Sequence, residues 1–255
     1  MAKPAVILVG ADKGGVGKTT VSRALLDYLI AHGIPTRAFD TEAPRGTLRR
    51  FHPDITEVVD ITSTPDQMKV FDSLTTANAQ VTVIDVRAGL LSTTLRALRD
   101  IGFLDAAKKS QLTFGVFHIL GPSVASLDEI AETSTLVSEF NYFLVKNFIN
   151  NTTFFEWDPG TYNAYFKKIK GVHEITIPKL NEMACEQVEL ASVPFVSFVA
   201  NKGMESQPAD YSFVLRGYVR HWLGNVWAEF DRVRLNDIVG ADASRKNQAR
   251  QERAG

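Results

Sequence analysis

The sequence predicts an α/β fold in which a mostly parallel, twisted sheet carries helices on both faces. Its apolar runs are short, rich in β-branched residues and continuous rather than alternating, which is typical of strands buried on both sides. Longer segments with helical spacing lie between these runs, and such alternation builds strand–helix–strand units with right-handed crossovers. At 255 residues, the chain is long enough to bury one large core.

Six apolar runs are expected to form the strands of this sheet. They recur along the first two thirds of the chain, and the intervening segments are long enough for a crossover helix. The runs are Ala5–Gly10, Thr36–Asp40, Val81–Val86, Leu112–Leu120, Tyr142–Phe148 and His173–Ile177.

The helices are predicted from periodic apolar positions and from end signals. In Thr19–His32 the apolar residues share one side, and Gly33 with Pro35 ends the segment. Ser123 is a suitable N-cap for the next helix. The further predicted helices are Val124–Phe140, Pro178–Leu190 and Tyr211–Asp237. Residues 149–165 are expected to form a loop or lid. We expect residues 1–239 to form a single domain and the polar, basic residues 240–255 to form a flexible tail.

Composition narrows the possible functions. The formal net charge is −1 and the pI about 6.5, so any nucleic-acid surface must be local. Cys185 is the single cysteine, which excludes an intramolecular disulfide and favours a reducing cytoplasm. It lies in a helical stretch, where a small packed side chain is expected. No apolar stretch approaches the roughly 18 residues of a membrane-spanning helix, so a soluble protein is predicted.

A glycine-rich loop follows the first strand and leads into a helix. The stretch reads ADKGGVGKTT, and its glycines allow backbone N–H groups to point at phosphate oxygens. Lys18 is expected to reach the β- and γ-phosphates, and the Thr19 hydroxyl to ligate Mg²⁺. Asp12 stands where the strict motif has its first glycine, and the motif offers no role for it. The predicted nucleotide-binding residues of the loop are Gly14, Gly15, Val16, Gly17, Lys18, Thr19 and Thr20.

The octapeptide KGGVGKTT resembles the deviant Walker A motif of the ParA/MinD family of P-loop ATPases. The resemblance covers residues from about 5 to about 200 and implies a P-loop NTPase fold. It also implies an ATP-dependent homodimer in which Lys13 crosses the interface and contacts the phosphates bound by the other subunit. A cation supplied by a partner subunit acts as an arginine finger does, by stabilising the charge of the transferring phosphoryl group.

Acidic residues at two further strand ends extend the resemblance. By the family pattern Asp40 lies on the metal side, and Glu42 stands where an aspartate usually positions the hydrolytic water. Because glutamate is one methylene longer, hydrolysis could be slow. Asp85 ends a strand that resembles Walker B and binds Mg²⁺ through water in the family, and Gly89 follows it in the place of a γ-phosphate contact. Arg87 stands where the family often has proline.

The base of the nucleotide is expected to lie near the last strands. Asn147 offers both a donor and an acceptor, which suits the adenine edge, and Pro178 occupies a family position near the base. Two simpler interpretations stay open. Asn147 is also typical of a strand-end turn, and Pro178 of the first position of a helix.

The resemblance leaves the cellular target open. One cysteine excludes the iron–sulfur branches of the family. The tail has no apolar face, so no direct membrane anchor is expected. Non-specific DNA binding through basic residues is the alternative to an ordinary solvated surface with acidic residues interspersed. The candidate basic residues are Lys167, Lys168, Lys170, Arg216, Arg220, Arg232, Arg234, Arg245, Lys246, Arg250 and Arg253.

The leading hypothesis is therefore a cytoplasmic ParA-like ATPase with ATP and Mg²⁺ as cofactors. It dimerises on ATP, binds a cognate adaptor or cargo protein and positions a plasmid, a DNA transfer complex or another large assembly. The alternatives are an ATP-dependent ligase of the dethiobiotin-synthetase type, which generally lacks the crossing lysine, and a slowly hydrolysing ATP-sensing regulator.

Overall fold

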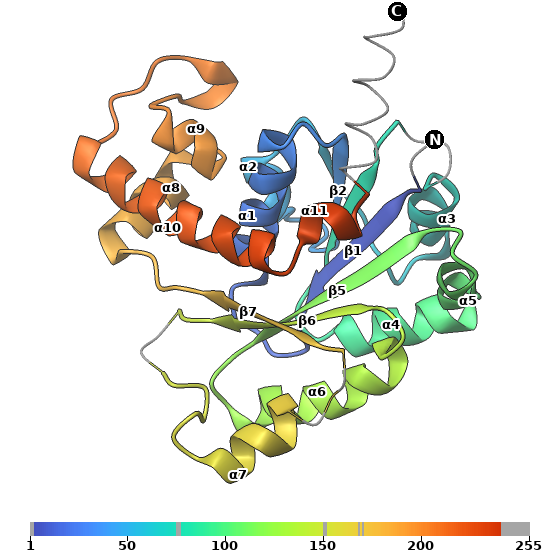
Figure 1. The fold of residues 1–255 in the computed structure, drawn as a ribbon. Coiled ribbons are helices and arrows are strands. Elements are labelled where there is room, and N and C mark those ends of the chain that lie inside the picture. Colours follow the sequence, from blue (N-terminus) through green and yellow to red (C-terminus); the bar gives the residue numbers. More distant parts are fainter. Residues whose placement is uncertain (1–2, 75–77, 150–151, 168, 170, 241–255) are drawn as a thin grey trace, which may run out of the picture.

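The structure, a computed structural model, describes residues 3–74, 78–149, 152–167, 169 and 171–240. Its centre is a seven-stranded sheet with the order β3-β2-β4-β1-β5-β6-β7, in which every neighbouring pair is parallel. Helices cover both faces of this sheet (Figure 1). The predicted α/β class with a mostly parallel sheet is confirmed.

Six of the seven strands coincide with the predicted runs to within one residue at each end. They are β1 (Ala5–Gly10), β2 (Thr36–Asp40), β4 (Val81–Asp85), β5 (Thr113–Leu120), β6 (Asn141–Asn147) and β7 (His173–Ile177). The seventh, β3 (Thr56–Val58), pairs with β2 at the edge of the sheet. The sequence analysis missed β3 because three residues are too few to show a pattern.

Two hydrophobic cores lie on the two faces of the sheet. Alternate residues of one strand enter different cores, so that Ile7 and Val9 of β1 join one and Val6 and Leu8 the other. The first core is closed by α1 (Lys18–Ala31), α8 (Glu182–Ala191), α9 (Phe195–Val199) and α10 (Phe213–Arg232). The second is closed by α3 (Thr64–Asp72), α4 (Leu91–Asp100), α5 (Phe103–Lys108) and α6 (Val124–Val137).

The remaining helices are short. Three predicted helix limits were wrong by three to five residues, among them the end of Val124–Phe140, which lies at Val137. The short helices are α2 (Thr47–Phe51), α7 (Pro159–Tyr162), the π-helical η1 (Asn163–Lys167), the 3₁₀ turn η2 (Met204–Ser206) and α11 (Leu235–Ile238). The helix expected from Pro178 begins only at Glu182, because the Asn181 side chain caps it by accepting from the Ala184 N–H. The helix expected to reach Asp237 ends at Arg232, and Arg234 with φ 56° separates it from α11.

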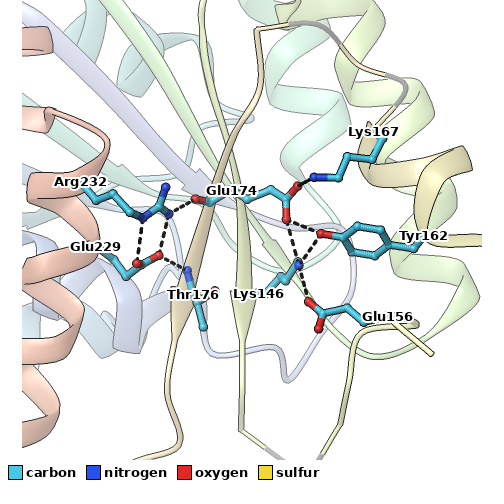
Figure 2. Close-up of polar contacts among 8 residues, drawn as sticks. All are labelled: Lys146, Glu156, Tyr162, Lys167, Glu174, Thr176, Glu229 and Arg232. Carbon is cyan, nitrogen blue, oxygen red and sulfur yellow. Dashed lines mark hydrogen bonds and ion pairs between the residues drawn. The ribbon is translucent and has the colours of Figure 1, made fainter. Parts of the chain in front are cut away.

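Residues 149–165 were expected to form a loop or lid, but Pro159–Tyr162 form α7 and η1 begins at Asn163, so this expectation was wrong for residues 159–165. A polar network fastens residues 152–167 to the sheet (Figure 2). The Lys146 ammonium lies 2.9 Å from Glu156 and 2.9 Å from Glu174, and donates to the Tyr162 hydroxyl at 3.1 Å. Burial lowers the pKa of Lys146, but its hydrogen bonds to Glu174 and Glu156 outweigh this and raise the pKa above its ordinary value. The segment is therefore held down by a charged lysine on β6.

Several of the basic residues proposed to contact DNA are paired within the molecule. Lys167 lies 3.7 Å from Glu174, and Arg232 forms an ion pair of 2.8 Å with Glu229 (Figure 2). Arg216 donates to two backbone carbonyls and Arg234 pairs with Asp237. The candidates Lys168, Lys170, Arg245, Lys246, Arg250 and Arg253 lie outside the described residues, as does the expected tail after Gly240.

The length and hydrophobicity of the helices decide whether any of them could span a membrane. Within the described ranges, none has the length and apolar character needed to cross a bilayer.

Candidate functional site

The predicted site residues come together at the carboxyl edge of the sheet. The glycine-rich loop joins the end of β1 to the start of α1. Asp40 and Asp85 end the neighbouring strands β2 and β4 and stand directly opposite each other in the register. In open parallel sheets this edge is where ligands bind.

The backbone of the loop leaves the start of α1 open to an anion. Gly15 and Gly17 have φ values of 72° and 84°, which L side chains rarely adopt. Gly17 is the N-cap residue of α1, and no side chain caps the first turn. The first N–H groups of α1, together with the partial positive charge of the helix end, therefore point at a place suited to phosphate.

A buried lysine and a buried aspartate face this place. Burial lowers the pKa of Lys18, and the negative charges of Asp85 and Glu42 partly restore it. Asp85 accepts hydrogen bonds from the Thr19 hydroxyl at 2.8 Å and from the Ser22 hydroxyl at 2.9 Å. Sequence reasoning missed Ser22, although its position one helical turn after Lys18 places it on the same side of α1.

The pKa of Asp85 rises from 3.8 to about 7 because the carboxyl group is fully buried and Asp40 lies near it. Burial also raises the pKa of Asp40, although three backbone N–H groups oppose this. A buried carboxyl group whose pKa is raised by a neighbouring carboxylate is typical of a site that a cation completes.

Asp40 and Glu42 both accept hydrogen bonds from the start of α2, and Asp40 also accepts one from the loop before it. The Asp40 carboxylate accepts from the Glu42 N–H at 2.9 Å and the Leu48 N–H at 2.6 Å, and more weakly from the Arg49 N–H at 3.3 Å. The Glu42 carboxylate accepts from the Thr47 hydroxyl. The expected roles of Asp40 toward metal and of Glu42 toward water stay predictions.

The loop after β4 lies beside the glycine-rich loop. A Cβ added at Gly14 would meet the Ala88 Cβ at 3.8 Å, and Gly89 has φ 82°. The Arg87 N–H donates to the Thr41 hydroxyl at 2.8 Å, while the Arg87 side chain is exposed. Lys13 is exposed at the same edge, as the predicted contact with a second subunit requires.

Asp12, which the motif did not explain, connects the loop to two helices. Its carboxylate accepts from the Ser92 N–H of α4 at 3.2 Å and from the Ser92 hydroxyl. Its own N–H donates to the Glu129 carboxylate of α6 at 3.0 Å. No signal in the sequence indicated that Ser92 and Glu129 belong to this edge.

A cavity of about 330 Å³ adjoins the loop at the predicted place of the base, and Thr20, Asn147 and Pro178 are among its lining residues. The Asn147 side chain also donates to the Val16 carbonyl at 2.8 Å and so supports the glycine-rich loop. Pro178 does not begin a helix, and its carbonyl accepts from the Trp222 indole at 2.7 Å. Contact of either residue with a base remains a prediction.

The far wall of this cavity differs from expectation. Cys185 is exposed and lines the cavity. The expectation of a packed cysteine was therefore wrong.

Arg23 also lines the cavity, with its guanidinium 3.4 Å from the ring centre of Phe51 and 4.2 Å from that of Phe195. An ion pair of 2.5 Å with Glu189 neutralises it. Sequence analysis missed Arg23, because a buried arginine is uncommon.

The side chains at the loop include possible ligands for a metal ion. Within the described part of the chain, no three His, Cys, Asp or Glu side chains cluster in a way that could hold a metal ion by themselves. The Thr19 hydroxyl with the Asp85 carboxylate is a smaller set, and it fits Mg²⁺, which commonly takes one or two protein ligands when phosphates and waters supply the rest.

A parallel sheet with an open glycine-rich loop, a buried lysine and a strand-end aspartate defines a P-loop nucleotide-binding fold. Similar solved structures indicate which type of P-loop fold the chain has. MinD from Pyrococcus horikoshii, solved with Mg-ADP, is 18% identical with a TM-score of 0.54, over 93% of this chain and 98% of that one. A ParA family ATPase from Chlorobium tepidum is 13% identical with a TM-score of 0.52, over 86% and 97%. MinD from Aquifex aeolicus is 16% identical with a TM-score of 0.50, over 87% and 97%.

The fold of the chain is thus that of ParA/MinD-type P-loop ATPases. No protein-family model matches the sequence, and no curated protein matches it.

Proposed function

We propose that the chain is a ParA-like ATPase that binds ATP with Mg²⁺, dimerises around the nucleotide and hydrolyses it slowly. One observation carries the proposal: at the carboxyl edge, the uncapped start of α1 faces the same place as Lys18 and the Thr19–Asp85 pair. The similar MinD structure from Pyrococcus horikoshii contains Mg-ADP, which supports the same ligands here.

The residues of the site have distinct roles in this proposal. The N–H groups at the start of α1 bind phosphate oxygens, and Lys18 neutralises their charge. Thr19 and Asp85 hold Mg²⁺, directly or through water, with Asp40 on the same side. Bound Mg²⁺ neutralises phosphate charge and polarises the phosphoryl oxygens. Asp85, whose pKa is raised by burial and by Asp40, would be held ionised beside the cation.

Slow hydrolysis follows from the state of Glu42. A residue that orients the attacking water needs a free carboxylate oxygen near the γ-phosphate. In the structure one oxygen of Glu42 accepts from Thr47, which stands at the start of α2. The second carboxylate oxygen of Glu42 can still accept from a water molecule, but the bond to Thr47 restricts where that oxygen points, and this restriction supports slow hydrolysis.

In this proposal the ATP-bound dimer positions a cargo. The exposed Lys13 supports such a dimer, because it is free to reach a second subunit. Binding of ATP brings two subunits together, a cognate adaptor or cargo protein recognises the dimer, and hydrolysis separates it. Non-specific DNA binding rests on fewer residues, because Arg232, Arg234 and Lys167 already have acidic partners. A DNA-binding titration at two salt concentrations tests that part, since phosphate contacts weaken steeply with salt.

The dimer is tested by light scattering with and without ATP and Mg²⁺. We expect the native chain to become a dimer with ATP, and Lys13→Ala to need at least tenfold more protein to do so. Lys109→Ala is the matched control, because Lys109 is exposed beside the start of β5, at the opposite edge of the sheet. A native chain that stays monomeric at saturating ATP would contradict the proposal and favour the ligase alternative.

A further inference from the structure

We propose that Asp12 is a positioning residue that joins the glycine-rich loop to α4, and that it thereby sets the direction of Lys13 toward a second subunit. This inference rests on the proposed ATP-dependent dimer, but the connection it describes exists in the single chain. It also assigns a role to an aspartate for which the phosphate-binding motif gives none.

The first argument is the start of α4. Its N-cap residue is Leu90, whose side chain has no hydrogen-bonding group, and no local side chain caps the helix. The Asp12 carboxylate takes this place from a distant part of the chain by accepting both from the N–H and from the hydroxyl of Ser92. A carboxylate at a helix start is also favoured by the helix dipole.

The second argument is that the backbone of Asp12 is held from the opposite side. Its N–H donates to Glu129 of α6 at 3.0 Å, and Glu129 lies 3.4 Å from Nε2 of His118. His118 is fully buried in β5, and its Nδ1 lies 2.8 Å from the Tyr142 hydroxyl. Asp12 thus stands between α4 on one side and a buried polar chain on the other.

The third argument is the position of Asp12 beside Lys13 in the chain, and of Ser92 just after the loop that follows β4. Asp12 directly precedes Lys13, so fixing the backbone of Asp12 restricts the directions in which the exposed Lys13 side chain can leave the loop. Ser92 follows the loop that contains Ala88 and Gly89, and a Cβ at Gly14 would meet Ala88 at 3.8 Å. The Asp12–Ser92 contact therefore sets the spacing of the two loops that flank the γ-phosphate in the proposed complex.

The fourth argument is the choice of aspartate. Asp12 adds a negative charge near Lys18, where the proposed ligand is itself negative. Such a charge is unfavourable for phosphate binding unless its carboxylate has another task. Accepting two hydrogen bonds from Ser92 is such a task, because both oxygens of a carboxylate are acceptors.

The experiment compares Asp12→Ala, Asp12→Asn and Ser92→Ala with the native chain, and Asp54→Ala serves as an exposed control. Affinity for a fluorescent ATP analogue, ATP-dependent dimerisation and kcat are measured on each. We expect Asp12→Ala to lower kcat and dimer affinity at least tenfold, while analogue affinity in the monomer changes less than threefold. Asp12→Asn should restore most of the loss, since its amide can accept from the N–H of Ser92 and donate to the hydroxyl oxygen.

A second measurement does not depend on dimerisation. Hydrogen exchange of the first turn of α4, without nucleotide, should quicken in Asp12→Ala and remain near native in Asp12→Asn. If the native chain does not dimerise with ATP but exchange follows this pattern, the proposed function fails and the connection stands. If exchange of α4 is unchanged in Asp12→Ala, or if analogue affinity falls as far as kcat, the role proposed for Asp12 is refuted.

Discussion

Replacement of Asp85 by asparagine should stabilise the protein without ligand at pH 8 while it abolishes Mg²⁺-dependent ATP binding. The carboxyl group is fully buried, and burial with the nearby Asp40 raises its pKa from 3.8 to about 7. Asparagine retains the size of the side chain and can still bond to the hydroxyls of Thr19 and Ser22. The variant therefore removes a poorly solvated charge with little loss of packing.

The expected gain in the free energy of unfolding follows from the raised pKa of Asp85. A raised carboxyl pKa means that the folded chain holds the proton more tightly than the unfolded chain, so stability falls as pH rises from the unfolded pKa to the folded pKa. At about 1.4 kcal/mol for each pH unit, the gap between 3.8 and about 7 is worth about 4 kcal/mol. The destabilisation by the ionised Asp85 carboxylate is absent below about pH 4 and complete above about pH 7.

The assay is urea unfolding at pH 5 and pH 8, without nucleotide or Mg²⁺. The stability advantage of Asp85→Asn over the native chain should grow by about 2–3 kcal/mol between these pH values. Asp54→Asn makes the same charge change at an exposed position and should show no such growth. An advantage that is equal at both pH values, or a variant less stable than the native chain at pH 8, would refute the reasoning.

Two further predictions concern the glycine-rich loop and residues 152–167. Gly17→Ala should cost about 1–3 kcal/mol of stability and at least tenfold in ATP affinity, because φ is 84° and the new Cβ would lie 2.3 Å from the Asn147 amide nitrogen; unfolding and titration curves like those of the native chain would contradict this. Lys146→Met should cost about 1–3 kcal/mol, because it removes the nearer of the two ammonium groups beside Glu174 and leaves only Lys167 at 3.7 Å. Limited proteolysis should then cut residues 152–167 faster, and an unchanged cutting rate would show that the ion pair does not hold the segment.

Much of the fold could be predicted because its signals are local. A strand buried on both faces, such as Ala5–Gly10, shows as a continuous apolar run, and the glycine-rich loop has its chemistry within nine consecutive residues. The short elements could not be predicted in this way. The edge strand Thr56–Val58 has too few residues for a pattern, and α2 is only five residues long.

Site residues that follow a strand or a motif along the chain were predicted. Site residues that only tertiary contacts bring to the nucleotide edge were missed. Asp85 was found because it ends an apolar strand. Arg23 and Cys185 were not assigned to the nucleotide edge, because only the packing of α8 beside α1, where Glu189 pairs with Arg23, brings their positions to one cavity. For the same reason the contact of Asn147 with the Val16 carbonyl has no trace in the sequence, since 131 positions separate the two residues.

The helices that follow the two acidic strand ends share an unusual construction. Neither α2, which begins after Gly46, nor α4, which begins after Leu90, has a side-chain cap of its own. Each receives a carboxylate from the nucleotide edge instead, from Asp40 in one case and Asp12 in the other. A helix start that depends on a carboxylate weakens when that carboxylate turns to another partner. If Asp40 turns to bound Mg²⁺, exchange of the first turn of α2 should quicken while that of α4, which Asp12 still caps, should not; equal changes in both helices would contradict this difference.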